Sequence, residues 1–158
     1  MAKATRATLH LDKVGVAYLL HPYDYRDDAG GKGLQAADAL GAPPHRVLKT
    51  LMARVDGQPV CAILPSDAKV STKKLAAVFA GKSAEMMATA DAERISGYKV
   101  GGISPFAQQR TVPTVIEASV MDAPSVWINA GQRGLLVELA PQAVCTAIEG
   151  LRSADVIA

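Results

Sequence analysis

The stretch Val47 to Leu64, VLKTLMARVDGQPVCAIL, decides the fold of this chain. Two runs of residues that favour β-strands, 47–55 and 59–64, flank Asp56-Gly57, a dipeptide typical of tight hairpin turns. We therefore expect two antiparallel strands joined by a short turn. Strand alternation places Lys49 on the more apolar of the two faces of the first strand. Its ammonium group either extends to solvent at a sheet edge or points into a cavity, where it binds or polarises a ligand.

Helices and further strands are predicted on both sides of this hairpin. The upstream elements are a helix over 4–14, a strand over 16–21 and a short helix over 34–40. Between the last two, Asp27 to Gly33 holds three glycines and is predicted to be a flexible loop. The downstream elements are helices from Ser71 or Thr72 to Gly81 and from Thr89 or Asp91 to Gly97, strands near 98–100, 114–117, 125–129 and 135–139, and a helix from Pro141 to near Gly150.

The size and composition of the chain indicate one globular unit. It has 158 residues, of which 49% are hydrophobic and 20% are charged, so we expect a single domain over residues 1–158. Helices and hairpins follow one another without a regular βαβ repeat, which favours a mixed α/β or α+β fold. No apolar run is long enough to span a membrane, and the N-terminus carries no secretion signal. We therefore predict a cytoplasmic protein with no membrane partner.

Familiar catalytic signatures are absent from the sequence. It has no phosphate-binding glycine motif, no histidine-rich metal pattern and no nucleophile elbow, so neither a metal nor an organic cofactor is predicted. Cys61 and Cys145 stand far apart in apolar surroundings and are expected to be buried, reduced thiols. The formal net charge is only +2, which is small for a protein that binds nucleic acid by neutralising phosphates alone. A nucleic-acid partner would have to be held with help from another molecule.

Two glycine-rich segments could serve either chemistry or chain geometry. In Gly97 to Pro105, the backbone N–H groups around the paired glycines can face a carbonyl or a developing oxyanion, or the segment is simply a tight loop. The same two interpretations apply to Gly131 to Gly134, which either faces a ligand or is a hairpin turn with a solvated arginine. Tyr23, at the exit of a predicted strand, either packs in the core or lines a pocket mouth.

Three segments together identify a resemblance. They are VLKTL at 47–51, GYKVGGISP at 97–105 and AGQRGL at 130–135. In this order and spacing the chain resembles the YbaK family of aminoacyl-tRNA deacylases, which is related to the editing domain of bacterial prolyl-tRNA synthetases. The resemblance runs from about Leu9 to Leu151. It implies a curved mixed sheet flanked by helices around a pocket, as in the editing domain.

The resemblance also implies an activity. Such proteins remove a wrong amino acid from tRNA in trans, after the synthetase has released it. For the YbaK type, the target is cysteine on proline tRNA, and cysteinyl-tRNA(Cys) is a further expected substrate. The substrate's own thiol attacks its ester and leaves as a thiolactone, so the enzyme is a hydrolase, or a lyase if the thiolactone forms. The implied partners are the acceptor end of proline tRNA and prolyl-tRNA synthetase in a transient complex.

Site residues follow from the same resemblance, position by position. Lys49 matches the family's essential pocket lysine, Gly101 the backbone position that contacts the aminoacyl end, and Tyr23 a tyrosine at the pocket edge. We therefore expect Lys49 and Gly101 to be catalytic. The expected substrate-binding residues are Tyr23, Thr50, Gly102, Ile103, Asn129 and Gly131.

Asn129 departs from the family pattern, in which a serine usually stands before the glycine-rich turn. An amide is bulkier than a hydroxyl, yet it still offers hydrogen-bond donors and an acceptor. It can therefore keep an orienting hydrogen bond while it reshapes the pocket. This leaves two alternatives open: a deacylase for another small amino acid, such as alanine on proline tRNA, or a non-catalytic module that binds aminoacyl-tRNA.

Overall fold

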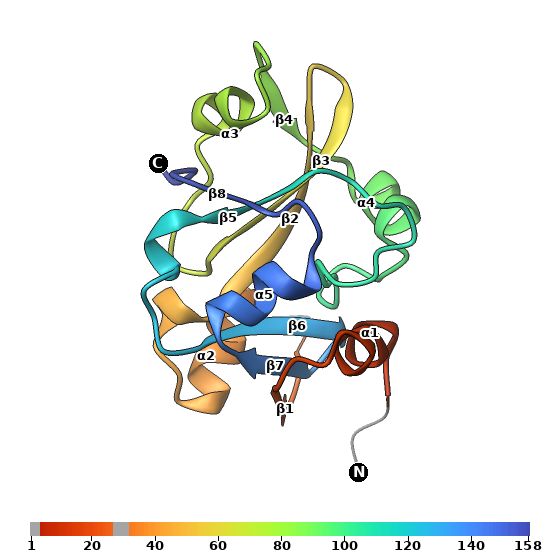
Figure 1. Ribbon diagram of the computed structural model, residues 1–158, viewed down its shortest axis with the longest axis vertical. Helices are drawn as coiled ribbons and strands as arrows, with labels where there is room; N and C mark the ends of the chain where they lie inside the picture. Colours follow the sequence, from red (N-terminus) through yellow and green to blue (C-terminus); the bar gives the residue numbers. More distant parts are fainter. Residues whose placement is uncertain (1–3, 27–31) are drawn as a thin grey trace.

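The computed structural model describes residues 4–26 and 32–158, which form a mixed α/β fold around two sheets (Figure 1). The larger sheet has the strand order β4-β2-β3-β5-β8. Its strands are β2 (Leu48–Val55), β3 (Gln58–Pro65), β4 (Ala84–Met86), β5 (Thr114–Glu117) and β8 (Arg152–Ala154). Neighbours pair antiparallel from β4 to β3 and parallel from β3 to β8, which makes the sheet mixed as predicted.

The smaller sheet has the order β1-β7-β6 and is antiparallel throughout. Its strands are β1 (Leu19–Pro22), β6 (Val126–Gln132) and β7 (Leu135–Leu139). An isolated parallel bridge between Val47 and Trp127 joins the beginning of β2 to β6. The chain thus connects the two sheets at the residues just before the predicted pocket lysine.

Helices pack against both faces of the larger sheet. The α-helices are α1 (Arg6–Val14), α2 (Lys32–Leu40), α3 (Thr72–Val78), α4 (Thr89–Ser96) and α5 (Pro141–Ala147), with short 3-10 helices η1 (Pro44–Arg46) and η2 (Ala118–Val120). One face of the larger sheet packs through Ile63 and Ile116 against the smaller sheet, α1 and α5. The opposite face packs against α3. No helix within the described ranges is both long enough and apolar enough to cross a bilayer.

The predicted hairpin is confirmed, with Val55 paired to Gln58 across Asp56-Gly57. The strand expected near 98–100 is wrong, because these residues form a turn instead. In it the Val100 N–H donates to the Glu93 carboxylate at 2.8 Å, and the Gly102 N–H donates to the Lys99 carbonyl at 2.8 Å. These bonds use local partners, so no neighbouring strand is needed.

Other differences lie at the ends of elements. The short strands β4 and β8 were not predicted, and the last helix ends at Ala147 rather than near Gly150. Of the predicted loop Asp27 to Gly33, residues 27–31 lie outside the described residues, and the last two belong to α2.

The packing of Ile63 gives a test of the core. Its side chain is fully buried between the sheets, whereas Leu19 on β1 is 63% exposed. Ile63→Ala should lower the free energy of unfolding by about 2–5 kcal/mol, because it leaves a cavity. Leu19→Ala, the matched control, should change it by no more than about 0.5 kcal/mol. Urea unfolding measures both, and equal losses would contradict the described core.

Candidate active site

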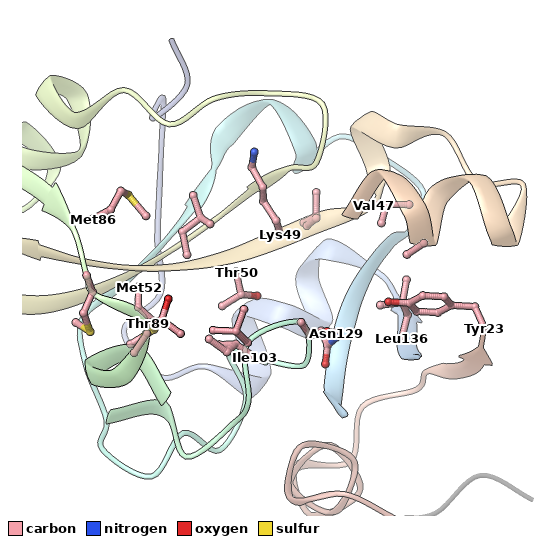
Figure 2. A pocket seen from close by; sticks show the side chains of 17 residues that line it. Tyr23, Val47, Lys49, Thr50, Met52, Met86, Thr89, Ile103, Asn129 and Leu136 are labelled. Atoms are coloured by element: carbon pink, nitrogen blue, oxygen red, sulfur yellow. Dashed lines mark hydrogen bonds between the residues drawn. The ribbon is translucent and has the colours of Figure 1, made fainter. Parts of the chain in front are cut away.

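A cavity of about 350 Å³ lies along β2, within the size range of small-molecule sites (Figure 2). Its walls come from β2, β6, β7, α2, α4, the end of β4, the 97–105 loop and the segment after β1. The lining residues are Tyr23, Ala36, Val47, Leu48, Lys49, Thr50, Leu51, Met52, Met86, Met87, Thr89, Ala92, Val100, Gly101, Ile103, Asn129 and Leu136.

The edge of β2 is open beside this cavity. β4 pairs only with residues 53–55 of β2, and the Met87 N–H donates to the Met52 carbonyl at 3.1 Å. Alternate residues of an antiparallel strand turn their backbone polar groups to the same side. The backbone N–H and carbonyl of Thr50 therefore face the same edge as the Met52 carbonyl, where no described strand lies beside them.

The Thr50 side chain also has an unused polar group. Its Oγ1 is buried, and no described residue gives it a hydrogen-bond partner. Figure 2 shows this side chain on the side of β2 that faces Ile103 and Asn129. A buried hydroxyl without a partner costs free energy, so a ligand that supplies the missing hydrogen bond gains from it.

Lys49 leaves β2 on the opposite side from Thr50 (Figure 2). Its ammonium donates to the Ala68 carbonyl at 2.5 Å. Burial lowers the pKa of Lys49; the nearby Asp67 acts in the opposite direction, and Lys69 adds to the lowering. Residues from both faces of β2 line the cavity, and both Lys49 and Gly101 are among the lining residues, although the ammonium lies on the opposite face of β2 from Thr50 (Figure 2). Their joint role in catalysis stays a prediction.

Tyr23 reaches the cavity from the segment that follows β1 (Figure 2). Burial raises the pKa of its phenol above the usual value. The group is therefore protonated at neutral pH and can donate a hydrogen bond. Tyr23 is fixed by its own backbone, because its N–H donates to the Gly134 carbonyl at 2.8 Å. This places it at the cavity wall, one of the two positions that its sequence context allowed.

Gly101 and Gly102 allow segments of the protein itself to approach closely. A Cβ on Gly101, whose φ is +91°, would clash with the Tyr25 phenol oxygen, and one on Gly102 would lie 2.8 Å from the Arg133 backbone nitrogen. The space that these glycines leave beside their Cα atoms is therefore filled by protein. Gly101 nevertheless lines the cavity, and its N–H has no acceptor among the described residues.

Asn129 holds the β6–β7 turn against the 97–105 loop. Its Nδ2 donates to the Gly101 carbonyl at 3.1 Å, and its Oδ1 accepts from the N–H groups of Gly131 at 2.7 Å and Gln132 at 3.2 Å. The amide thus keeps the orienting hydrogen bond that the sequence suggested, and it does so within the protein. This leaves the Gly101 carbonyl engaged at the wall of the cavity.

The structure brings most of the predicted site residues together. Tyr23, Lys49, Thr50, Gly101, Ile103 and Asn129 all line the cavity. Gly102 and Gly131 do not line it; the first packs on the backbone of residues 132–133, and a Cβ on the second would meet the Tyr98 ring at 2.7 Å. Their role as substrate contacts stays a prediction.

The methionines of the cavity wall were missed. Met52 shares a face of β2 with Thr50, a placement that strand alternation could have indicated. Met86 is the last residue of β4 and Met87 is the next residue along the chain. This strand is too short to be recognised from its pattern. Together with Ile103 and Ala92 they give this part of the cavity an apolar lining.

No described residue that lines the cavity is a carboxylate, an imidazole or a thiol. Cys61 is the cross-strand partner of Met52 on β3, but it is fully buried, and burial raises the pKa of its thiol to about 12. Within residues 4–26 and 32–158, no cluster of three or more His, Cys, Asp or Glu side chains could hold a metal ion. The groups available for chemistry are the Lys49 ammonium, hydroxyls and backbone amides.

Comparison of the sequence with known protein families identifies the family of this chain. Residues 32–146 match the aminoacyl-tRNA editing domain family. The chain belongs to this family. The predicted resemblance to YbaK-type editing proteins is thereby confirmed, and so is the expected fold class.

Individual relatives agree with the family. Over 115 residues the chain is 33% identical to "Putative Cys-tRNA(Pro)/Cys-tRNA(Cys) deacylase EbsC" of Enterococcus faecalis, covering 72% of this chain and 70% of that protein. It is 25% identical over 100 residues to a proline–tRNA ligase of Streptococcus suis, covering 63% of this chain and 16% of the ligase. The structure named "Crystal structure of a putative trans-editing enzyme for prolyl tRNA synthetase" shares the fold, with a TM-score of 0.81, 17% identity and 99% of both chains covered.

The unpartnered hydroxyl of Thr50 can be tested by its effect on stability. Thr50→Val keeps the shape and removes the unpartnered hydroxyl, so it should raise the free energy of unfolding by about 1 kcal/mol. The matched control is Thr114→Val, because Thr114 is buried and its Oγ1 donates to the Val112 carbonyl at 3.0 Å. That change should lower stability by about 1 kcal/mol. Chemical denaturation of both variants tests this, and a destabilised Thr50→Val would show that the hydroxyl has a partner in solution.

Proposed function

We propose that this protein removes cysteine mischarged on proline tRNA, acting in trans on tRNA that the synthetase has released. Cysteinyl-tRNA(Cys) is a further substrate in this proposal. The observation that carries it is the cavity wall, which offers a cation, hydroxyls and backbone amides but, among the described residues, no carboxylate, imidazole or thiol to act as nucleophile or general base. The name of the Enterococcus faecalis relative, which specifies the same two cysteinyl-tRNAs, supports the choice of amino acid.

In the proposed reaction the substrate supplies its own nucleophile. The thiol sulfur of the esterified cysteine attacks the ester carbonyl carbon, and a carbon–sulfur bond forms. The bond between that carbon and the ribose oxygen breaks, and the thiol proton ends on the ribose oxygen. The products are a cyclic thiolactone and tRNA with a free terminal hydroxyl. Attack by water instead of the thiol would give cysteine and the same tRNA.

The described residues have separate roles in this proposal. The Gly101 N–H, which has no described acceptor, donates to the carbonyl oxygen as charge develops there. The Thr50 hydroxyl and its open backbone edge orient the aminoacyl group. Lys49 binds or polarises the ester after its ammonium turns from the Ala68 carbonyl around the strand edge. The methionine-lined wall excludes water from the reacting atoms.

The first test is a panel of proline tRNAs charged separately with cysteine, alanine, serine and proline. We expect selective loss of cysteine, because serine lacks the thiol. Lys49→Ala should lower turnover about a hundredfold or more, the size of effect expected when a group that stabilises the developing charge is lost. Lys73→Ala, an exposed lysine on α3, is the matched control and should retain wild-type turnover.

Each other result has a definite meaning. Undiminished turnover of Lys49→Ala would remove Lys49 from the mechanism. Cleavage of alanine in place of cysteine would favour a deacylase for another small amino acid, with Asn129 as part of the altered pocket. A folded protein that binds a non-cleavable substrate analogue, yet cleaves none of the four esters, would favour a binding module.

Synthetase binding is a second part of the proposal. The net charge of +2 favours weak intrinsic tRNA binding, so prolyl-tRNA synthetase would supply specificity in a transient ternary complex. Sedimentation of the protein with the synthetase should show association that is stronger when proline tRNA is present. The absence of any association at micromolar concentrations, with or without tRNA, would contradict this part alone.

A further inference from the structure

Arg133 stands in the turn between β6 and β7 and is held in one orientation. Its Nε donates to the Val100 carbonyl at 2.8 Å, and its guanidinium carbon lies 5.4 Å from the centroid of the Tyr25 ring. The ring contact is of the cation–π kind. An exposed arginine that is fixed through its Nε and its flat face is pre-organised, because little side-chain freedom remains to be lost on binding.

The remaining donors of Arg133 are available. Its Nε is the donor to Val100, and neither Nη group has a carboxylate or carbonyl partner in the described part of the chain. The side chain is exposed, so these donors face solvent. Two adjacent N–H groups in a planar fork match the oxygens of a phosphate.

The position of Arg133 relates it to the cavity. It bonds Val100, which lines the cavity, and its backbone packs on Gly102, next to Gly101 in the cavity wall. The 97–105 loop therefore carries the candidate ester-binding group on one side and holds the guanidinium on the other. Lys99, the exposed residue just before Val100, adds a second positive charge to this part of the surface.

The chemistry of the proposed substrate indicates which anion the Arg133 guanidinium would bind. The ester is attached to the ribose of the last nucleotide, so the first phosphate along the chain is the one that joins the last two nucleotides. We propose that Arg133 binds this phosphate and thereby sets how far the tRNA end enters the cavity. The inference rests on the proposed deacylase function. It assigns a substrate contact to a residue that the sequence left as a solvated arginine in a turn.

The test compares two substrates that carry the same ester. One is cysteinyl-tRNA(Pro), and the other is 2′(3′)-O-cysteinyl-adenosine, which has no phosphate. Arg133→Gln should lower kcat/KM for the tRNA about tenfold or more, mainly through KM, because charge-assisted hydrogen bonds are lost. The fall for the adenosine ester should be far smaller. The matched control is Lys82→Gln, which removes one charge just before β4, at the opposite end of the molecule from β6 and β7 (Figure 1).

A binding measurement keeps the inference testable without turnover. Fluorescence anisotropy with uncharged proline tRNA, repeated over a range of salt concentrations, gives the slope of log Kd against log salt. Arg133→Gln should reduce the magnitude of this slope by about one, as expected for one lost phosphate contact, and Lys82→Gln should not. Arg133→Lys should keep most of the slope, since the charge remains.

The outcomes separate this inference from the proposed function. Equal losses on both substrates would make Arg133 a support of the 97–105 loop and overturn the phosphate contact. An unchanged salt slope would overturn it as well. If the wild-type protein cleaves neither ester, the deacylase function fails, while the salt slope still decides whether Arg133 contacts tRNA. An effect seen only with the synthetase present would assign Arg133 to a protein contact instead.

Discussion

The unpaired edge of β2 at Thr50 is the constraint on which the site depends. Backbone polar groups in a sheet need partners, and here β4 covers the edge only at residues 53–55. The strand is fixed on its other side by β3 and at its beginning by the bridge from Val47 to Trp127. A rigid strand with one free edge offers fixed donors and acceptors to whatever enters the cavity. Side chains from both faces of the strand can then contact one ligand.

A second requirement is that three segments meet closely at glycines, which leave room for the neighbouring backbone and for the Tyr25 ring. The 97–105 loop, the β6–β7 turn and the segment after β1 meet at Gly101, Gly102 and Gly134, where an added Cβ would clash. Asn129 and Arg133 then tie the first two segments through the carbonyls of Gly101 and Val100. The glycines of the family motifs thus have a packing role, and they place one backbone N–H at the cavity wall.

The sequence predicted the hairpin because a local pattern determines it, whereas the site segments were predicted from the resemblance to the family. Alternation and Asp56-Gly57 define β2 and β3, and the motif around Lys49 falls inside that strand. Other features depend on contacts with residues outside the segment whose pattern is read. The 98–100 strand failed because Glu93, on α4, supplies the hydrogen bond that a neighbouring strand would have given. The direction of the Lys49 ammonium, towards Ala68, depends on a loop that no local pattern places.

The burial of Cys61 has a consequence under the proposed function. Under the proposed chemistry the released thiolactone is an acylating agent, and a thiolate close to the cavity would be its first target. Cys61 lies opposite Met52 on the neighbouring strand β3, but burial raises the pKa of its thiol to about 12, so the sulfur is protonated and shielded. Burial therefore protects this thiol from acylation by the product that the proposed reaction releases beside it.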